Sequence, residues 1–367
     1  MATTYTGTVN REPMPSPQGG CLLMVGNFLS AVRNTHSVCE DLAARLAQGG
    51  WDVVTTSAKP GRVSRLADMV QTTWRNRDKY SVAQVDVYSG AAFRWAEIVC
   101  WLLRRAGKPY ILTLHGGDLP QFSNRYPRRV ERLLNSATAV TVPSEYLLQY
   151  MARYRRGLRL IPNGLDLDSY IFRVRVKPAP RLVWLRAFHQ IYNPSLAPRV
   201  AALVRQQFPE VQLAMVGTDK NDGSWRATRR VARQLGVFDS VQWLGGVPKA
   251  RVPTILDSGD IFLNTTNFDN TPVSVLEALA SGLCVVSTNV GGLPHLLTNE
   301  LNALLVPAED AEAMARAVTR ILTEPGLAER LSADGRQLAK QFEWSAILPE
   351  WQALLAAVKE EGSAATP

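Results

Sequence analysis

Short apolar runs alternate with helical patterns along most of the chain. In the first half, apolar runs typical of buried strands lie at 21–25, 52–56, 85–88, 110–114, 137–142 and 158–161. Helical periodicity separates several of them, at 37–48, 91–106 and 145–153. Because strands that alternate with helices form parallel sheets covered by helices, this half predicts one doubly wound α/β domain.

The alternation starts again after a basic, proline-containing stretch at 173–180. Six further runs follow, at 182–185, 211–216, 241–244, 261–264, 284–287 and 303–306. Both halves are therefore predicted to be Rossmann-like domains with doubly wound parallel sheets. The expected organisation is a loose tail over 1–20, a first domain over 21–172, a linker over 173–180 and a second domain over 181–342.

The composition is that of a folded protein. Of the 367 residues, 46% are hydrophobic and 20% charged, which excludes disorder along the whole chain. No apolar run approaches the roughly 20 residues of a bilayer span, and the N-terminal tail lacks the apolar core of a secretory signal. The four cysteines follow no metal-ligand or redox spacing. We expect a cytoplasmic protein with reduced thiols and no metal site.

The excess positive charge lies in the first half. The formal net charge is +9, and residues 1–180 hold 24 of the 41 Lys and Arg but only 13 of the 32 Asp and Glu. Two basic clusters consist of Arg125, Arg128, Arg129 and Arg132, and of Arg153, Arg155, Arg156 and Arg159. They indicate an anionic membrane surface or an acidic substrate, with a solvated helix face as the alternative. Nucleic acid is not expected, because the motifs of nucleic-acid modules are missing.

The loops that follow the strands are the candidate binding sites, because ligands of doubly wound sheets lie beyond the carboxyl ends of the strands. These loops contribute Asn27, His115 and Asn163 from the first domain, and Arg186, Gly217, Lys220 and 267–271 from the second. If the two domains face each other, all of these loops line one cleft.

The segment 269–282 is the most informative part of the chain. Pro272 suits the start of a helix, whose free backbone N–H groups would point at an anion in the cleft. Asp269 and Glu277 lie eight positions apart, one before this helix and one inside it, so both can face one ligand. Carboxylates accept hydrogen bonds only, which suits them to sugar hydroxyls.

This segment resembles the signature of two acids separated by seven residues in the family-four retaining glycosyltransferases. The same resemblance extends over most of the chain, through His115-Gly116, the run 162–166, the run 291–294 and the run 302–307. It implies the GT-B architecture, in which two Rossmann-like domains face a central cleft. It also implies that 343–367 contains a closing helix that crosses back onto the first domain.

The resemblance implies a role for each matched residue. Glu277 would bind the ribose of a nucleotide-sugar donor, Asp269 would contact the transferred sugar, Arg186 would pair with the diphosphate, and His115 would lie near the reacting centre. Further donor contacts are expected from Asn270, Thr271, Pro272, Val273, Lys220, Gly217 and Asn27. The donor is a substrate, so no cofactor is implied, and cationic side chains make a metal unnecessary. Asp269 and Glu277 are binding groups in this scheme, not general bases.

Three departures from the family pattern affect the prediction. Asp269 stands where the family usually has glutamate, and the lysine expected a few residues after Arg186 is missing, with Lys220 as the nearest substitute. The first loop lacks paired glycines, and Arg33 lies there instead.

Two functions remain open. The first is a metal-independent hexosyltransferase whose acceptor is a glycan, a lipid-linked molecule or a small molecule, with the protein in the cytoplasm or peripheral on the membrane. The second is a catalytically weakened protein that binds a nucleotide-sugar. A core position satisfied by backbone groups is the alternative for His115, as is an ordinary helix position for Glu277.

Overall fold

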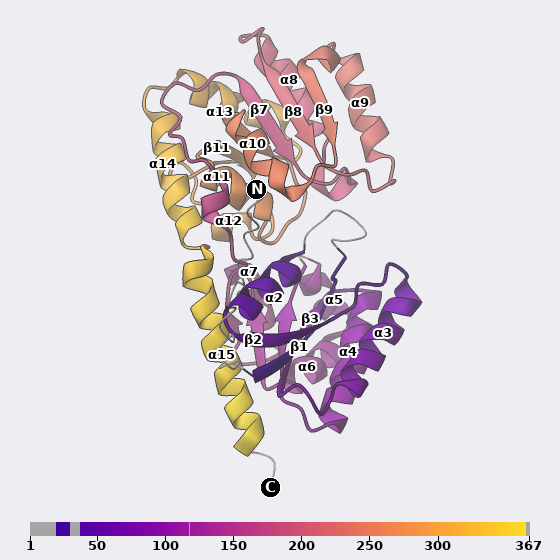
Figure 1. Cartoon of the computed structure of the whole chain (residues 1–367). Helices are drawn as coiled ribbons and strands as arrows, with labels where there is room; N and C mark the ends of the chain where they lie inside the picture. The colour runs from indigo at the N-terminus through magenta and orange to yellow at the C-terminus, as the bar shows by residue number, and fades with distance from the viewer. Residues whose placement is uncertain (1–19, 30–36, 117, 365–367) are drawn as a thin grey trace, which may run out of the picture.

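The chain forms two domains, each built on a parallel six-stranded sheet (Figure 1). The computed structural model describes residues 20–29, 37–116 and 118–364. The first sheet contains β1 (Gly20–Val25), β2 (Trp51–Thr56), β3 (Val82–Val87), β4 (Tyr110–Leu114), β5 (Ala139–Val142) and β6 (Arg159–Leu160). The second contains β7 (Arg181–Leu185), β8 (Gln212–Val216), β9 (Val241–Gly245), β10 (Ile261–Asn264), β11 (Cys284–Thr288) and β12 (Leu304–Val306). The predicted α/β class with two doubly wound sheets is confirmed.

Helices cover both faces of each sheet. Those of the first domain are α2 (Val38–Gln48), α3 (Arg62–Arg75), α4 (Ala91–Arg105), α5 (Leu119–Arg125), α6 (Pro127–Asn135) and α7 (Glu145–Met151). Those of the second are α8 (Leu196–Arg205), α9 (Ser224–Gln234), α10 (Val252–Asp257), α11 (Val273–Ala280), α12 (Leu293–Leu296), α13 (Ala311–Thr323) and α14 (Leu327–Lys340). The last helix is α15 (Trp344–Ala364).

The strand order places one switch point in each sheet. The first sheet has the order β2-β1-β3-β4-β5-β6 and the second has β12-β11-β10-β7-β8-β9. The chain therefore reverses direction across the sheet between β1 and β3, and again between β10 and β7. Loops that leave neighbouring strands at such a point diverge, and the crevice between them is where ligands bind.

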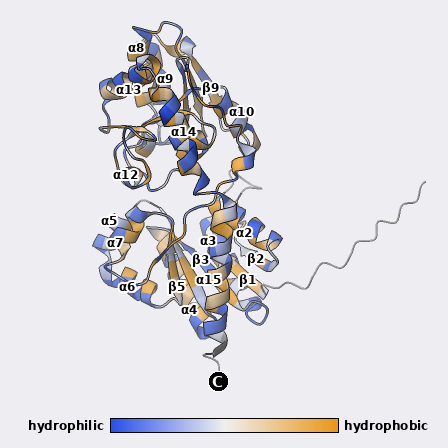
Figure 2. Ribbon diagram, turned by 90° about the vertical axis from the view of Figure 1, so that its left-hand side faces the viewer, coloured by the Kyte–Doolittle hydropathy of each residue, from blue (hydrophilic) through white to orange (hydrophobic). Residues whose placement is uncertain are grey.

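Apolar residues on both faces of each sheet form the cores. Figure 2 shows hydrophobic colouring along strands of the first sheet. Buried residues such as Leu23, Val85 and Leu112 pack under α4 and α6, and Trp184, Leu213 and Leu263 pack under α8 and α13. Strands buried on both faces consist of nearly continuous apolar residues, as expected of parallel sheets. For this reason the apolar runs in the sequence predicted the positions of most strands.

The chain passes between the domains earlier than the linker predicted at 173–180. Leu165, Leu167 and Tyr170 already pack in the second-domain core, and Arg175 is buried there beside Asp260. Within the stretch predicted as the linker, Arg175 is buried and pairs with Asp260, whereas Arg173 and Lys177 are exposed. The crossing therefore lies near Gly164, just before these core residues.

The last helix returns to the first domain. Trp344, Ile347 and Trp351 of α15 pack against Leu22 and Trp51. In Figure 1 the helices α14 and α15 run down one side of both domains. At the return, Leu165 and Glu343 form a parallel bridge, so the two crossing segments lie side by side. A Cβ at Gly164 would lie 2.4 Å from the Trp344 ring, so only glycine permits this close approach.

Within residues 20–29, 37–116 and 118–364, no helix is long and apolar enough to cross a membrane. The tail predicted over 1–20 lies outside this description except for Gly20, which begins β1.

Candidate active site

Residues of both domains line a cavity of about 290 Å³ in the cleft. His115, Tyr88 and Asn163 contribute from the first domain, and Tyr192 and Asp269 from the second. Asn270 and Thr271 complete the second-domain wall. The fold thus brings together four strand-end loops of the first domain and the switch-point loops of the second.

Arg186 and Asp269 meet at the switch point of the second sheet. Arg186 directly follows β7 and Asp269 lies in the loop after β10, and their side chains form an ion pair through Nη2 and Oδ2. The Arg186 guanidinium also lies 4.4 Å from the centre of the Tyr192 ring, and its Nε has no hydrogen-bond partner among the described residues. Burial alone would lower the pKa of Arg186, but the charge of Asp269 keeps it raised. The Arg186 guanidinium is therefore a permanent cation beside the cleft residue Asp269.

Gly217 allows the Arg186 loop to lie against the end of β8. The Gly217 φ angle is +151°, and a Cβ there would lie 1.7 Å from the Arg186 carbonyl oxygen. The Arg186 backbone N–H donates to the Val216 carbonyl at 3.0 Å, which fixes the start of this loop. Gly217 thus acts on the site through the backbone that carries Arg186.

Glu277 is buried in the second domain and has two side-chain partners. Its Oε1 accepts a hydrogen bond of 2.8 Å from the Tyr170 hydroxyl and forms an ion pair with Lys249. The Glu277 side chain is only 5% exposed, whereas that of Lys249 is 45% exposed. Burial and the neighbouring Glu277 charge raise the pKa of Tyr170, so this hydroxyl stays a donor. A buried carboxylate needs such partners, because an unpaired buried charge is costly.

The start of α11 lies between the two acids. The helix begins at Val273, and Pro272 precedes it as the N-cap residue, one position before the expected first turn. Asn270 accepts a hydrogen bond from the Ser144 hydroxyl of the first domain, so this loop also contacts the opposite wall. Ser274 in the first turn is buried, and its hydroxyl has no hydrogen-bond partner among the described residues. The first N–H groups of α11 and this hydroxyl are candidate contacts for a phosphate.

His115 is held by a buried carboxylate in the opposite wall. Its Nε2 lies 2.9 Å from Asp86 Oδ1, and the Tyr88 ring stacks on the imidazole with the ring centres 5.2 Å apart. Gln84 donates a second hydrogen bond of 2.8 Å to Asp86. Burial alone would raise the pKa of Asp86, but the charge and hydrogen bond of His115 lower it. In the neutral imidazole, a Nε2–H donor to Asp86 leaves His115 Nδ1 as an acceptor.

Other predicted site residues lie away from this cavity. The Asn27 side chain accepts a hydrogen bond of 2.9 Å from Arg65 inside the first domain. Lys220 is exposed on the loop after β8 and does not line the cleft cavity. The predicted contribution of Arg33 lies outside the described residues.

The basic clusters of the first domain divide into structural and exposed members. Arg155 donates to the carbonyl oxygens of Leu134, Ala137 and Thr138, which close the end of α6. Burial lowers the pKa of Arg155. Arg129 pairs with Glu97 through two contacts of 3.0 and 2.5 Å. The clusters are therefore only partly a solvated surface.

The sequence patterns did not single out Asp86, Tyr88, Tyr170 or Lys249. For Asp86 a signal existed, since a carboxylate inside an apolar buried strand requires a partner. No sequence signal pointed to Lys249, because it belongs to no motif and lies beside Glu277 only in the folded structure. Within the described residues, no group of three or more His, Cys, Asp and Glu is arranged to hold a metal ion.

Two Rossmann-like domains that face a cleft have the GT-B architecture, and here the second domain holds a cation and a buried carboxylate near its switch point. The family model "Glycosyl transferases group 1" matches residues 176–338, and "Glycosyltransferase Family 4" matches residues 35–169. The chain belongs to this family of GT-B glycosyltransferases, the family that it was predicted to resemble.

Relatives and a solved structure agree with this assignment. A D-inositol 3-phosphate glycosyltransferase of Segniliparus rotundus is 26% identical, over 68% of this chain and 61% of its own length. The chain thus spans less than two thirds of that relative. A GDP-mannose-dependent alpha-(1-6)-phosphatidylinositol monomannoside mannosyltransferase of Mycolicibacterium smegmatis is 25% identical, over 90% of this chain and 93% of its own length. HepE of Anabaena, in complex with UDP, superposes with a TM-score of 0.75 at 17% identity, over 92% of this chain and all of HepE.

Proposed function

We propose that the protein transfers a hexose from a nucleotide-sugar to an acceptor hydroxyl, with retention of anomeric configuration. The observation that carries this proposal is the ion pair between Arg186 and Asp269, a residue that lines the cleft cavity. The charge of the buried Glu277 also acts on Arg186, and the opposite wall holds His115 beside Asp86. The nucleotide nature of the donor is supported by the relative named as GDP-mannose-dependent and by the neighbour in complex with UDP.

The second domain binds the donor in this proposal. Glu277 accepts hydrogen bonds from the ribose hydroxyls, and the nearby Lys249 supplies a cation that the sequence pattern lacked. Arg186 and the first N–H groups of α11 bind the diphosphate. A diphosphate offers the guanidinium more charge and more oxygens than one carboxylate, so Arg186 exchanges Asp269 for the phosphate. Asp269 is then available to the hydroxyls of the transferred sugar.

The reaction occurs between the two walls. The bond between the anomeric carbon and the diphosphate oxygen breaks as the bond to the acceptor oxygen forms on the same face. The hydroxyl proton passes to the departing phosphate oxygen, so no side-chain base is consumed. Arg186 and Lys249 stabilise the negative charge of the leaving group, which is the role that a metal would otherwise have. His115, oriented by Asp86, accepts a hydrogen bond from a sugar or acceptor hydroxyl at Nδ1.

A donor-binding measurement tests the proposal. We expect calorimetry with GDP-mannose and UDP-glucose to detect binding of at least one donor to the wild type, and Glu277→Ala to abolish it. Glu329→Ala is the matched control, because Glu329 is an exposed helical glutamate outside the cleft. Equal donor affinity in Glu277→Ala and the wild type would refute the assignment of Glu277. Donor binding without any transfer to the acceptors tested would favour a catalytically weakened binding protein.

The acceptor is proposed to be anionic or lipid-linked, with the protein cytoplasmic or peripheral on the membrane. Support comes from the exposed Arg128 and Arg132 on α6 and from the inositol-containing names of the relatives. Neutralising both arginines should weaken binding to anionic vesicles at low salt, and neutralising Arg226 and Arg230 of α9 in the second domain should not. This part of the proposal would be contradicted if the affinity for vesicles changed neither on substitution of these arginines nor with the salt concentration.

A further inference from the structure

A second cavity, larger than the cleft cavity, opens in the first domain beside it. Its volume is about 580 Å³, and its walls come from the start of α4, from α5 and from the start of α6. Three arginines line it, Arg94, Arg125 and Arg129, together with the aromatic rings of Phe122 and Tyr126. We call this cavity the arginine pocket.

The arginine pocket adjoins the cleft. Asp118 lines both cavities. Ser89 lines the cleft and the next residue, Gly90, lines the arginine pocket. One ligand can therefore occupy the arginine pocket and still reach the cleft wall that contains His115.

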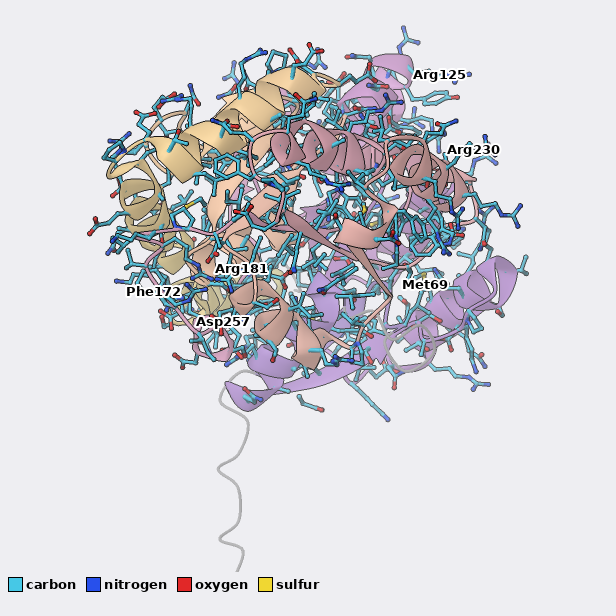
Figure 3. All side chains as sticks on the ribbon, turned by 90° about the horizontal axis from the view of Figure 1, so that it is seen from above. Met69, Arg125, Phe172, Arg181, Arg230 and Asp257 are labelled. Carbon is cyan, nitrogen blue, oxygen red and sulfur yellow. The ribbon has the colours of Figure 1, made fainter. Side chains whose placement is uncertain are left out.

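Two of the three arginines carry uncompensated charge. Arg94 and Arg125 are exposed, and no carboxylate within the described ranges forms an ion pair with either of them. In Figure 3 Arg125 lies at the edge of the molecule, on the opposite side from Arg181 and Asp257. Arg129 is held differently, because Glu97 binds it through two contacts and its guanidinium lies 5.5 Å from the centres of the Phe93 and Tyr126 rings.

The remaining walls suit a small polar ligand with one less polar face. The Phe122 and Tyr126 rings lie 5.0 Å apart, centre to centre, and offer a flat apolar surface. Asp118 occupies the N-cap position of α5, but its side chain makes no capping hydrogen bond there. An acceptor-only carboxylate at the boundary with the cleft suits the hydroxyls of a polyol.

We propose that the arginine pocket binds the phosphate of a phosphorylated polyol, and that this phosphate positions the polyol as the acceptor. The inference rests on the proposed transferase function and specifies its acceptor class. Arg94 and Arg125 bind the phosphate oxygens, Arg129 contributes through its Glu97-fixed guanidinium, and Asp118 orients a hydroxyl toward the cleft. Planar guanidinium groups match phosphate oxygens in pairs, which separates a phosphate monoester or diester from an uncharged polyol.

Calorimetric titration with glycerol 3-phosphate and with glycerol tests the phosphate requirement, because these probes differ only in the phosphate. We expect the wild type to bind glycerol 3-phosphate and not glycerol. Arg94→Gln and Arg125→Gln should each weaken glycerol 3-phosphate binding by about tenfold or more, the usual loss for a charge-assisted hydrogen bond. Arg94→Lys keeps the charge but loses the planar guanidinium group, so its affinity for glycerol 3-phosphate should lie between those of the wild type and Arg94→Gln. Arg105→Gln is the matched control, since Arg105 is exposed on the same helix but lies outside the pocket.

Vesicles containing phosphatidylinositol separate the two sources of the phosphate. Loss of glycerol 3-phosphate binding in the Arg94 and Arg125 variants supports a free phosphorylated polyol. A loss confined to the vesicles supports a lipid headgroup, and both results support a phosphate site. The proposal would be overturned if the wild type, the Arg94 and Arg125 variants and Arg105→Gln all bound glycerol 3-phosphate equally and all bound the vesicles equally. These measurements need no donor, so they stay informative even if Glu277→Ala disproves the donor assignment.

Discussion

Replacing Asp86 with asparagine isolates what the charge of this carboxylate contributes to the cleft. Asparagine has nearly the same shape as aspartate, but its amide group can donate to His115 Nε2, which would move the imidazole hydrogen to Nδ1. The group facing the cleft would then change from an acceptor to a donor. A hydrogen bond to a charged group contributes about 1.5–3 kcal/mol, which corresponds to a rate factor of about 10–150. We expect kcat to fall within this range while the KM for the donor changes little.

The same substitution should change how stability depends on pH. The folded-state pKa of Asp86 lies below its unfolded value, so Asp86 stabilises the fold above the unfolded pKa. This contribution is lost as the pH falls through the folded pKa. The difference in unfolding free energy between the wild type and Asp86→Asn should therefore be largest near neutral pH and should shrink below about pH 4.

Release of nucleoside diphosphate measures the rate effect, and chemical denaturation at several pH values measures the stability effect. Asp78→Asn is a suitable control, because Asp78 is an exposed carboxylate of the same domain. In a His115→Ala background, Asp86→Asn should cause little further loss of kcat, since Asp86 acts through His115. A full additional loss in that background, or an unchanged kcat in the single variant, would refute the positioning role.

Three further substitutions test the second domain. Lys249→Ala should weaken donor binding by about tenfold in calorimetry, as expected for the loss of one charge-assisted contact. Lys220→Ala should leave donor binding unchanged. If Lys220→Ala weakens donor binding and Lys249→Ala does not, Lys220 takes the role of the missing family lysine. Gly217→Ala should lower the midpoint of chemical denaturation and weaken donor binding, because its methyl group would collide with the Arg186 carbonyl oxygen. Wild-type behaviour in both measurements would show that the loop can move away freely.

The sequence predicted the architecture well because buried parallel strands are nearly continuous apolar runs. The exceptions have physical causes. The prediction began the third strand at 85, whereas β3 begins at Val82, because the polar residue Gln84 interrupts the apolar run. The helix α3 gave only a weak pattern, since its buried side chains are Arg65, Met69 and Thr73. Buried polar residues that have partners inside the fold interrupt the hydrophobic pattern, so the helix or strand that contains them is hard to predict from the sequence.

The candidate site was predictable only where a motif fixed it. The segment from Asp269 to Glu277 identified one wall of the cleft through the spacing of its two acids and the proline between them. The partners of Glu277 could not be found in this way, because Tyr170 and Lys249 lie far from it in sequence and only the packing of α11 brings them together. Of the three arginines of the pocket, Arg125 and Arg129 belong to a basic cluster that the sequence shows, whereas Arg94 comes from a different helix and joins them only in the folded structure.

The paired crossing at Leu165 and Glu343 bears on how the cleft opens. Two parallel peptide segments joined by backbone hydrogen bonds resist torsion more than one flexible tether does, but they still permit bending. Opening would then follow a single arc, and each closure would return Arg186 to the same place opposite His115. Deleting α15 should remove part of the first-domain core as well as one of the two segments, so the truncated chain would lose both its stability and its fixed path of closure.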